Sequence, residues 1–98
     1  MSESAFQAAL IKDLRNLFPG CIILKNDPNY LQGFPDLLIL FGTRWAALEC
    51  KQSSRSRNQT NQNYYVELAD KMSYASFVHP SNRERILDEL QQALRPRR

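Results

Sequence analysis

The sequence predicts an α/β fold in which helices flank a mixed β-sheet, and three observations support this class. Apolar residues recur at helical spacing in three segments of the chain. Four short runs rich in aliphatic or aromatic residues are typical of strands. The order αβββαβα includes a tight turn, which makes one strand pair antiparallel, and a helical crossover, which makes another pair parallel. No internal repeat or linker divides the 98 residues, so we expect a single domain over 1–98.

The first helix is expected over residues 3–18. Its apolar stripe comprises Phe6, Leu10, Leu14, Leu17 and Phe18. Pro19-Gly20 then stops the helix. Its N-terminus has two candidate caps, because Ser4 with Gln7 forms a capping-box pattern and Ser2 is a rival.

Three strands are expected after this helix. Residues 21–25 form a short β-branched run, and turn-forming residues continue from there to Gly33. Two further apolar runs, 37–41 and 45–48, are separated by the turn at 42–44. Such a short connection predicts an antiparallel hairpin.

The second half of the chain predicts a helix, a strand and a final helix. The helix is expected over about 60–73, after a polar loop. Its apolar stripe comprises Tyr64, Leu68 and Met72, with Tyr65 and Ala69 beside them. Residues 75–79 form a short strand. The pattern Ser81-Asn82-Arg83-Glu84 predicts a capping box for the final helix.

Composition and charge exclude several classes of protein. No apolar stretch approaches the roughly 20 residues of a membrane span, and the N-terminus lacks a signal-peptide pattern, so we expect a cytoplasmic protein without membrane contact. Cys21 and Cys50 fall in or beside apolar runs and are expected to be reduced thiols. The net charge of +3 mildly favours a polyanionic partner, although the basic tail 95–98, expected to be flexible, contributes much of it.

Chemically capable side chains gather at one end of the predicted hairpin. Residues i and i+2 of a strand face the same side, so Glu49 and Lys51 point the same way, and antiparallel pairing places Asp36 beside them. Two carboxylates suit Mg²⁺ or Mn²⁺, and such an ion activates water for phosphodiester hydrolysis. Lys51 would contact the scissile phosphate or the attacking water. The single histidine, His79, argues against a histidine–metal site or a Ser-His-Asp triad.

The segment Gly33-Phe34-Pro35-Asp36, followed by Glu49-Cys50-Lys51 in this element order, resembles the PD-(D/E)xK nuclease superfamily. The nearest branch is the VRR-NUC type, whose small stand-alone members occur in phages and bacteria. The resemblance covers nearly the whole chain. It implies a restriction-endonuclease-like core with catalytic residues at Asp36, Glu49 and Lys51, and a phage-encoded member would work in the host cytoplasm.

The resemblance also implies further site residues. A catalytic glutamine at the start of the next helix is matched by Gln62, with Gln59 and Gln52 as competitors, and it would position the water or a neighbouring phosphate. Glu3 would touch a second metal ion, and the backbone carbonyl of Cys50 would be a third ligand of the first. The implied cofactor is Mg²⁺, with Mn²⁺ able to substitute.

The expected partner is DNA. Five basic residues are expected to bind its phosphates without sequence preference: Arg44, Arg55, Arg57, Lys25 and Lys71. Nothing resembles a major-groove recognition helix, so we expect the shape of DNA to be recognised. Small nucleases of the family act on branched DNA such as Holliday junctions, and cutting two strands symmetrically needs two active sites, which favours a homodimer.

The leading hypothesis is therefore a divalent-metal-dependent, structure-specific endodeoxyribonuclease. The alternative is a non-catalytic DNA-binding module on a nuclease fold. A third hypothesis is a small interaction protein that docks through its last helix. Metal-dependent cleavage separates the first hypothesis from the second, and salt-insensitive or absent DNA binding would favour the third.

Overall fold

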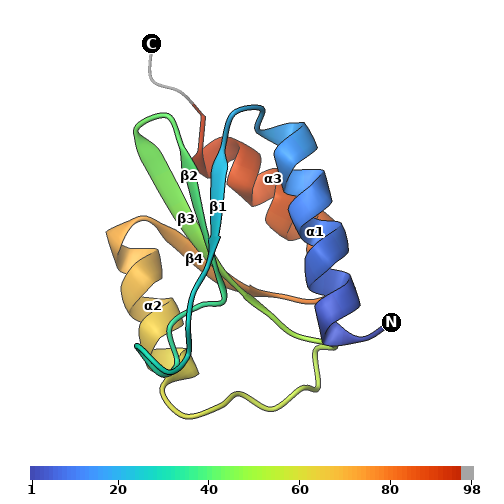
Figure 1. Ribbon diagram of the computed structural model, residues 1–98, viewed down its shortest axis with the longest axis vertical. Helices are drawn as coiled ribbons and strands as arrows, with labels where there is room; N and C mark the ends of the chain where they lie inside the picture. The colour runs from blue at the N-terminus through green and yellow to red at the C-terminus, as the bar shows by residue number, and fades with distance from the viewer. Residues whose placement is uncertain (96–98) are drawn as a thin grey trace.

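The computed structural model describes residues 1–95, which form four strands and three helices in the expected order αβββαβα (Figure 1). The elements are α1 (Glu3–Leu17), β1 (Ile22–Lys25), β2 (Leu37–Phe41), β3 (Arg44–Cys50), α2 (Gln62–Met72), β4 (Tyr74–Val78) and α3 (Arg83–Ala93). The tail expected at 95–98 lies outside the described range except for Arg95. No helix within residues 1–95 combines the length and hydropathy that a membrane span requires.

The four strands form one mixed sheet in the order β1-β2-β3-β4. Pairing is antiparallel between β1 and β2 and between β2 and β3, and parallel between β3 and β4, which confirms the predicted combination. The hairpin is tighter than expected, because Arg44 already pairs with Phe41. Since β2 runs opposite to the other strands, β1, β3 and β4 end at the edge where β2 begins; we call this the site edge.

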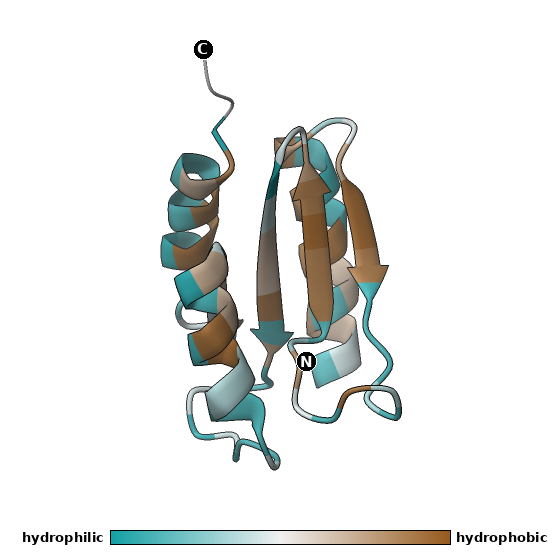
Figure 2. Ribbon diagram, turned by 90° about the vertical axis from the view of Figure 1, so that its left-hand side faces the viewer, coloured by the Kyte–Doolittle hydropathy of each residue, from teal (hydrophilic) through white to brown (hydrophobic). Residues whose placement is uncertain are grey.

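Helices cover both faces of the sheet, as predicted. The larger core, beneath α1 and α3, surrounds the fully buried Leu37, Ile39 and Leu48. The smaller core, beneath α2, comprises Ala47, Val66, Ala69 and Ala75. Because α2 contacts β3 and β4, it leaves the same face of β1 and β2 open (Figure 2). Ile22 and Leu24 are consequently exposed.

The ends of α1 differ in two details from the sequence prediction. Its N-terminal cap is Ser2, whose hydroxyl accepts a hydrogen bond from Ala5 N at 3.1 Å, so the capping box at Ser4 does not form. Leu17 was expected in the core but is exposed. The reason is that Phe18 leaves the helical path just after the helix and covers that end of the core.

The apolar stripe predicted for α2 was wrong at Tyr64 and Met72, although Ala69, expected beside it, is buried. Tyr64 and Met72 are 62% and 67% exposed, whereas Gln62, Val66 and Ala69 are the buried residues of this helix. Ala47 and Ala75 form the fully or nearly buried part of the sheet face beneath α2, so small residues on the helix pack more closely there than tyrosine would. The helix is therefore rotated relative to the expected stripe.

The capping box predicted for α3 does not form. Asn82, rather than Ser81, occupies the N-cap position, and its side chain makes no capping hydrogen bond. Asn82 Oδ1 instead accepts a hydrogen bond from His79 N at 2.8 Å, and the Ser81 hydroxyl is 2.8 Å from His79 Nδ1. These side chains therefore fasten the chain just after β4.

Candidate metal centre

Asp36 and Glu49 meet at the site edge because of the hairpin register. Leu37 pairs with Leu48, so Asp36, one residue before β2, lies opposite Glu49 near the end of β3. Cys50 N donates a hydrogen bond to Asp36 Oδ2 at 3.0 Å and holds the two strand ends together. The structure thus contains the juxtaposition expected from the sequence.

A third carboxylate reaches this pair from the first turn of α1. Oxygen atoms of Glu3, Asp36 and Glu49 all lie within 4.8 Å of one another, and we call this group the metal centre. Glu49 is 2% exposed, whereas Glu3 is exposed, so the group opens to solvent on the Glu3 side. Within residues 1–95, the buried Glu49 Oε1 has no hydrogen-bond partner. Such an oxygen is costly unless a proton or a cation satisfies it, and hard oxygen donors fit Mg²⁺ or Mn²⁺.

The Cys50 carbonyl points to the same side of β3 as this group. Lys51 N donates a hydrogen bond to Val78 O of β4 at 2.8 Å. Because a trans peptide group is planar, the Cys50 C=O points the opposite way from that N–H, toward β2 and Asp36. This direction is the one that a further metal ligand requires.

Lys51 is held beside Glu49 by Gln62, the first residue of α2. Lys51 Nζ donates to Gln62 Oε1 at 2.6 Å, and Gln62 Nε2 donates to Glu49 Oε2 at 3.0 Å. Lys51 Nζ also lies 3.9 Å from the same Glu49 oxygen. All three side chains are buried. Gln62 therefore bridges the carboxylate and the ammonium and orients both.

The other glutamines considered for this position have different contacts. Gln52 Nε2 donates to Met1 O, whereas Gln59 contacts Gln62 through its backbone: Gln59 N donates to Gln62 Oε1 at 2.7 Å, and Gln59 O accepts from Gln62 N at 3.2 Å. The carbonyl of Arg57 accepts a further hydrogen bond from Lys51 Nζ at 3.1 Å. Sequence reasoning missed this last contact, because no side-chain pattern signals a backbone acceptor.

Gly33 allows the residues just before α2 to approach the loop that leads into β2. Its φ is +94°, and a Cβ at this position would lie 2.7 Å from Thr60 O and from the backbone carbon of Asn61. Asn61 itself has a left-handed backbone with φ of 68°. Only glycine combines this conformation with the space that the approaching backbone occupies. Gly33 is therefore part of what places Gln62 in the metal centre.

Burial and mutual repulsion raise the pKa of both central carboxyls. The pKa of Glu49 rises from 4.5 to about 8, chiefly because the side chain is buried and next because of the charge on Asp36, while the Lys51 ammonium opposes the rise. Burial also raises the pKa of Asp36, against the hydrogen bond from Cys50 N. Without a metal ion, Glu49 therefore retains a proton near neutral pH, and a divalent cation would take the place of that proton.

We expect the metal-free protein to lose stability as the pH rises from 4.5 to about 8. Glu49 binds its proton more tightly when folded, so its stabilising contribution is complete below pH 4.5 and is lost as the pH passes about 8. The pKa of Glu89 is lowered, so that group titrates below this window. Thermal unfolding at a series of pH values measures how stability changes with pH, and Mg²⁺ should raise the Tm near pH 8. A Glu49→Gln variant with the parent's pH slope would contradict this assignment.

The expected DNA-binding residues divide into two groups. Lys25 ends β1 at the site edge, and Arg55 and Arg57 lie exposed in the loop that follows β3. Arg44 begins β3 at the hairpin end, so about 20 Å of strand separates it from the site edge. Lys71 is about 13 Å along α2 from the start of that helix. Only the first group lies near the carboxylates, and the expected basic surface is smaller than the sequence suggested.

No family model, curated protein or solved structure matches this chain. The chemistry of the metal centre follows from its donor atoms. Three carboxylates face one ammonium, so the fully ionised group carries net negative charge that a divalent cation would complement. An ammonium 3.9 Å from one carboxylate is also placed to neutralise an anionic group that approaches such a cation. This combination suits hydrolysis of a phosphate ester.

Proposed function

We propose that this protein is a divalent-metal-dependent endodeoxyribonuclease. The observation that carries the proposal is the convergence of Glu3, Asp36 and Glu49 within 4.8 Å of one another, with Lys51 beside Glu49. The proposed cofactor is Mg²⁺, with Mn²⁺ as a substitute, held by these carboxylates and the Cys50 carbonyl. The buried Glu49 Oε1, which no polar group in the described part of the chain satisfies, supports a cation at this position.

Each side chain has a role that its contacts support. The cation, when bound, would act as a Lewis acid and lower the pKa of a water molecule. Lys51 has three N–H donors and uses two for hydrogen bonds within residues 1–95, which leaves one to stabilise charge on the scissile phosphate. Gln62 fixes the distance between Lys51 and Glu49. Asp36 has one oxygen anchored by a backbone N–H and can offer the other to the cation.

The proposed substrate is DNA recognised by its shape, with branched duplexes such as Holliday junctions as the preferred class. Arg55 and Arg57, in the loop after β3, supply charge that binds phosphates of any sequence. Within residues 1–95 there is one group of at least three potential metal ligands. Symmetric cutting of a junction needs two such sites, so we propose that the enzyme is a homodimer.

The proposed family is the PD-(D/E)xK nuclease superfamily, with the VRR-NUC type as its branch. Pro35-Asp36 and Glu49-x-Lys51 supply the motif, and the order αβββαβ supports a restriction-endonuclease-like core. The contact between Gly33 and the backbone at 60–61 gives the glycine of the motif a physical role. These features support the proposal through this chain's own geometry.

Cleavage of labelled DNA tests the proposed function. The protein is incubated with a four-way junction, a linear duplex and a single strand, each with Mg²⁺, Mn²⁺ or a chelator. We expect cutting with either metal, fastest on the junction, and none with the chelator. If every substrate stays intact while DNA is still bound, the chain is a non-catalytic DNA-binding module and the proposal fails.

A further inference from the structure

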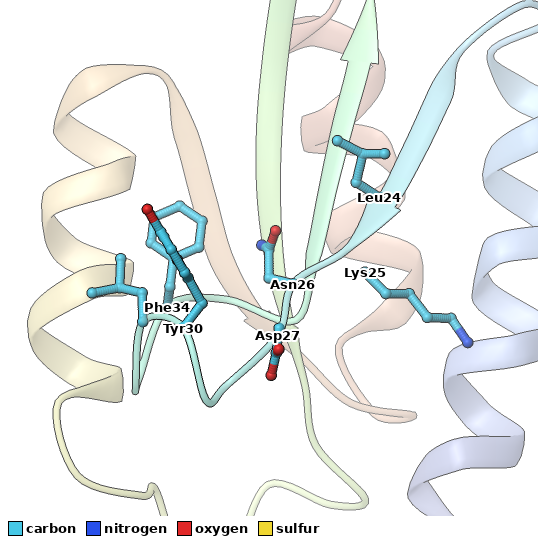
Figure 3. Close-up of a pocket in the computed structure, with 7 residues that line it drawn as sticks. Leu24, Lys25, Asn26, Asp27, Tyr30 and Phe34 are labelled. Atoms are coloured by element: carbon cyan, nitrogen blue, oxygen red, sulfur yellow. The ribbon is translucent and has the colours of Figure 1, made fainter.

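An apolar pocket lies beside the metal centre, between the end of β1 and the loop that connects β1 to β2. Its volume is about 450 Å³, and its walls include Leu24, Tyr30 and Phe34 (Figure 3). Asn26 and Asp27 provide polar groups. An apolar cavity of this size with a few polar groups is typical of a site for a small ligand or part of a larger one.

Asn26 connects the pocket to the metal centre. Its backbone N donates a hydrogen bond to Asp36 O at 2.7 Å, and its side-chain Nδ2 donates to Pro35 O at 2.6 Å. Phe34 precedes Asp36 by two residues, so their Cα atoms are no more than about 7 Å apart. A molecule held at the carboxylates therefore has the pocket within reach of an adjoining group.

Two aromatic rings line this pocket, and they differ in how firmly they are held. Tyr30 is 92% exposed, so the fold gains little from its ring. Phe34 is half-buried and packs against Tyr65, with ring centroids 6.1 Å apart. Exposed aromatic side chains of this kind bind unpaired nucleobases by stacking.

The polar groups of the pocket favour a neutral ligand that carries hydrogen-bond donors. Asn26 donates through Nδ2, which leaves Oδ1 as an acceptor, and Asp27 is a carboxylate with one oxygen bonded to Asn29 N at 2.8 Å. Figure 3 shows the Lys25 side chain directed away from the aromatic rings. Lys25 also lines the pocket, but because its ammonium is directed away from the rings, the acceptors of Asn26 and Asp27 disfavour a phosphate there and suit the exocyclic amino group of a base.

We propose that this pocket binds an unpaired nucleobase of the DNA strand whose phosphate lies at the metal centre. This inference rests on the proposed function. Bases with an amino group, namely adenine, cytosine and guanine, fit its acceptors better than thymine does. A base enters such a pocket only when it is unstacked, as at branch points and single-stranded ends. The pocket thus supplies a physical basis for a preference for branched over continuous duplex DNA.

Fluorescence of 2-aminopurine tests the pocket without any cleavage. The probe is a short single-stranded DNA with 2-aminopurine placed at successive positions, bound to the protein in chelator. We expect quenching at one position, and Tyr30→Ala should abolish it and weaken binding about tenfold. Tyr64→Ala is the matched control, because Tyr64 is also an exposed tyrosine but does not line the pocket. An abasic sugar at the quenched position should weaken binding to the parent but not to Tyr30→Ala.

Two results would overturn the base pocket. The first is equal loss of affinity in Tyr30→Ala and Tyr64→Ala, or fluorescence that does not depend on position. The second is that Tyr30→Ala changes a dimer into a monomer in light scattering while the fluorescence stays as in the parent. A second copy of this chain, rather than a base, would then be the occupant of the pocket. Quenching without metal-dependent cutting would refute the proposed nuclease and leave the base pocket standing, so the two failures are distinguishable.

Discussion

A Glu49→Gln variant is expected to lose metal-dependent DNA cleavage by about a thousandfold or more. Glutamine keeps the size of the side chain and still accepts a hydrogen bond from Gln62 Nε2. It removes one anionic donor from a group of three carboxylates, so the cation is held less tightly and is less well placed. Single-turnover cleavage of a labelled junction measures the loss.

The same substitution is expected to raise the free energy of unfolding by about 1 kcal/mol above pH 8 in the absence of metal. The Glu49 carboxylate is buried beside Asp36, which raises its pKa and makes its ionisation costly. A glutamine is neutral, and its amide can donate to Asp36. When a metal ligand is replaced in this way, we expect the rate of cleavage to fall and the free energy of unfolding to rise. Loss of both would instead indicate that Glu49 serves as a structural partner of Lys51.

Glu67→Gln provides the control for this pair of measurements. Glu67 is exposed on α2, so its substitution makes the same charge change outside the metal centre. We expect parental cleavage and nearly parental stability for this variant. Parental cleavage by a well-folded Glu49→Gln variant would remove Glu49 from the metal centre and with it the proposed reaction.

The juxtaposition of Asp36, Glu49 and Lys51 was predictable because it depends on geometry close in sequence. A tight turn makes the hairpin antiparallel, and the two-residue period of a strand sets the faces. These rules need no knowledge of what packs on the sheet. The site edge therefore followed from the sequence even though the exact ends of the strands did not.

The buried face of α2 was not predictable in the same way. Two stripes compete on this helix, one with Tyr64 and Met72 and one with Val66 and Ala69. The choice depends on the sheet beneath, where Ala47 and Ala75 leave room for a closely packed helix and larger side chains such as Trp45 pack beside them. Helical periodicity within one segment carries no information about the size of its partner residues.

Contacts between distant backbones were also beyond sequence reasoning. The Arg57 carbonyl that accepts from Lys51 Nζ has no side-chain signature. Basic residues can be counted in a sequence, but their distances from the carboxylates depend on the fold, and Lys71 lies about 13 Å along α2 from the start of that helix. Gly33 was visible as a motif residue, whereas its contact with Thr60 and Asn61 was not.

A Gly33→Ala variant is expected to lose about 3 kcal/mol or more of unfolding free energy, with cleavage reduced further than this loss explains. The new Cβ would lie 2.7 Å from the backbone at Thr60 and Asn61, which cannot swing aside as a flexible side chain can. Relief requires the start of α2 to move away from the loop that contains Gly33. Gln62 would move with it, and Lys51 and Glu49 would lose the side chain that bridges them.

Gly20→Ala separates this clash from the general cost of alanine at positive φ. Gly20 has a φ of +87°, close to the +94° of Gly33, but a Cβ there would meet nothing within 4 Å. We therefore expect a loss of only about 1 kcal/mol and parental cleavage per folded molecule. Chemical denaturation of both variants, with cleavage measured under folding conditions, gives the comparison. Equal losses of stability in the two variants would show that Gly33 serves only its own backbone conformation, and that the close approach of residues 60–61 to this loop does not depend on the missing side chain.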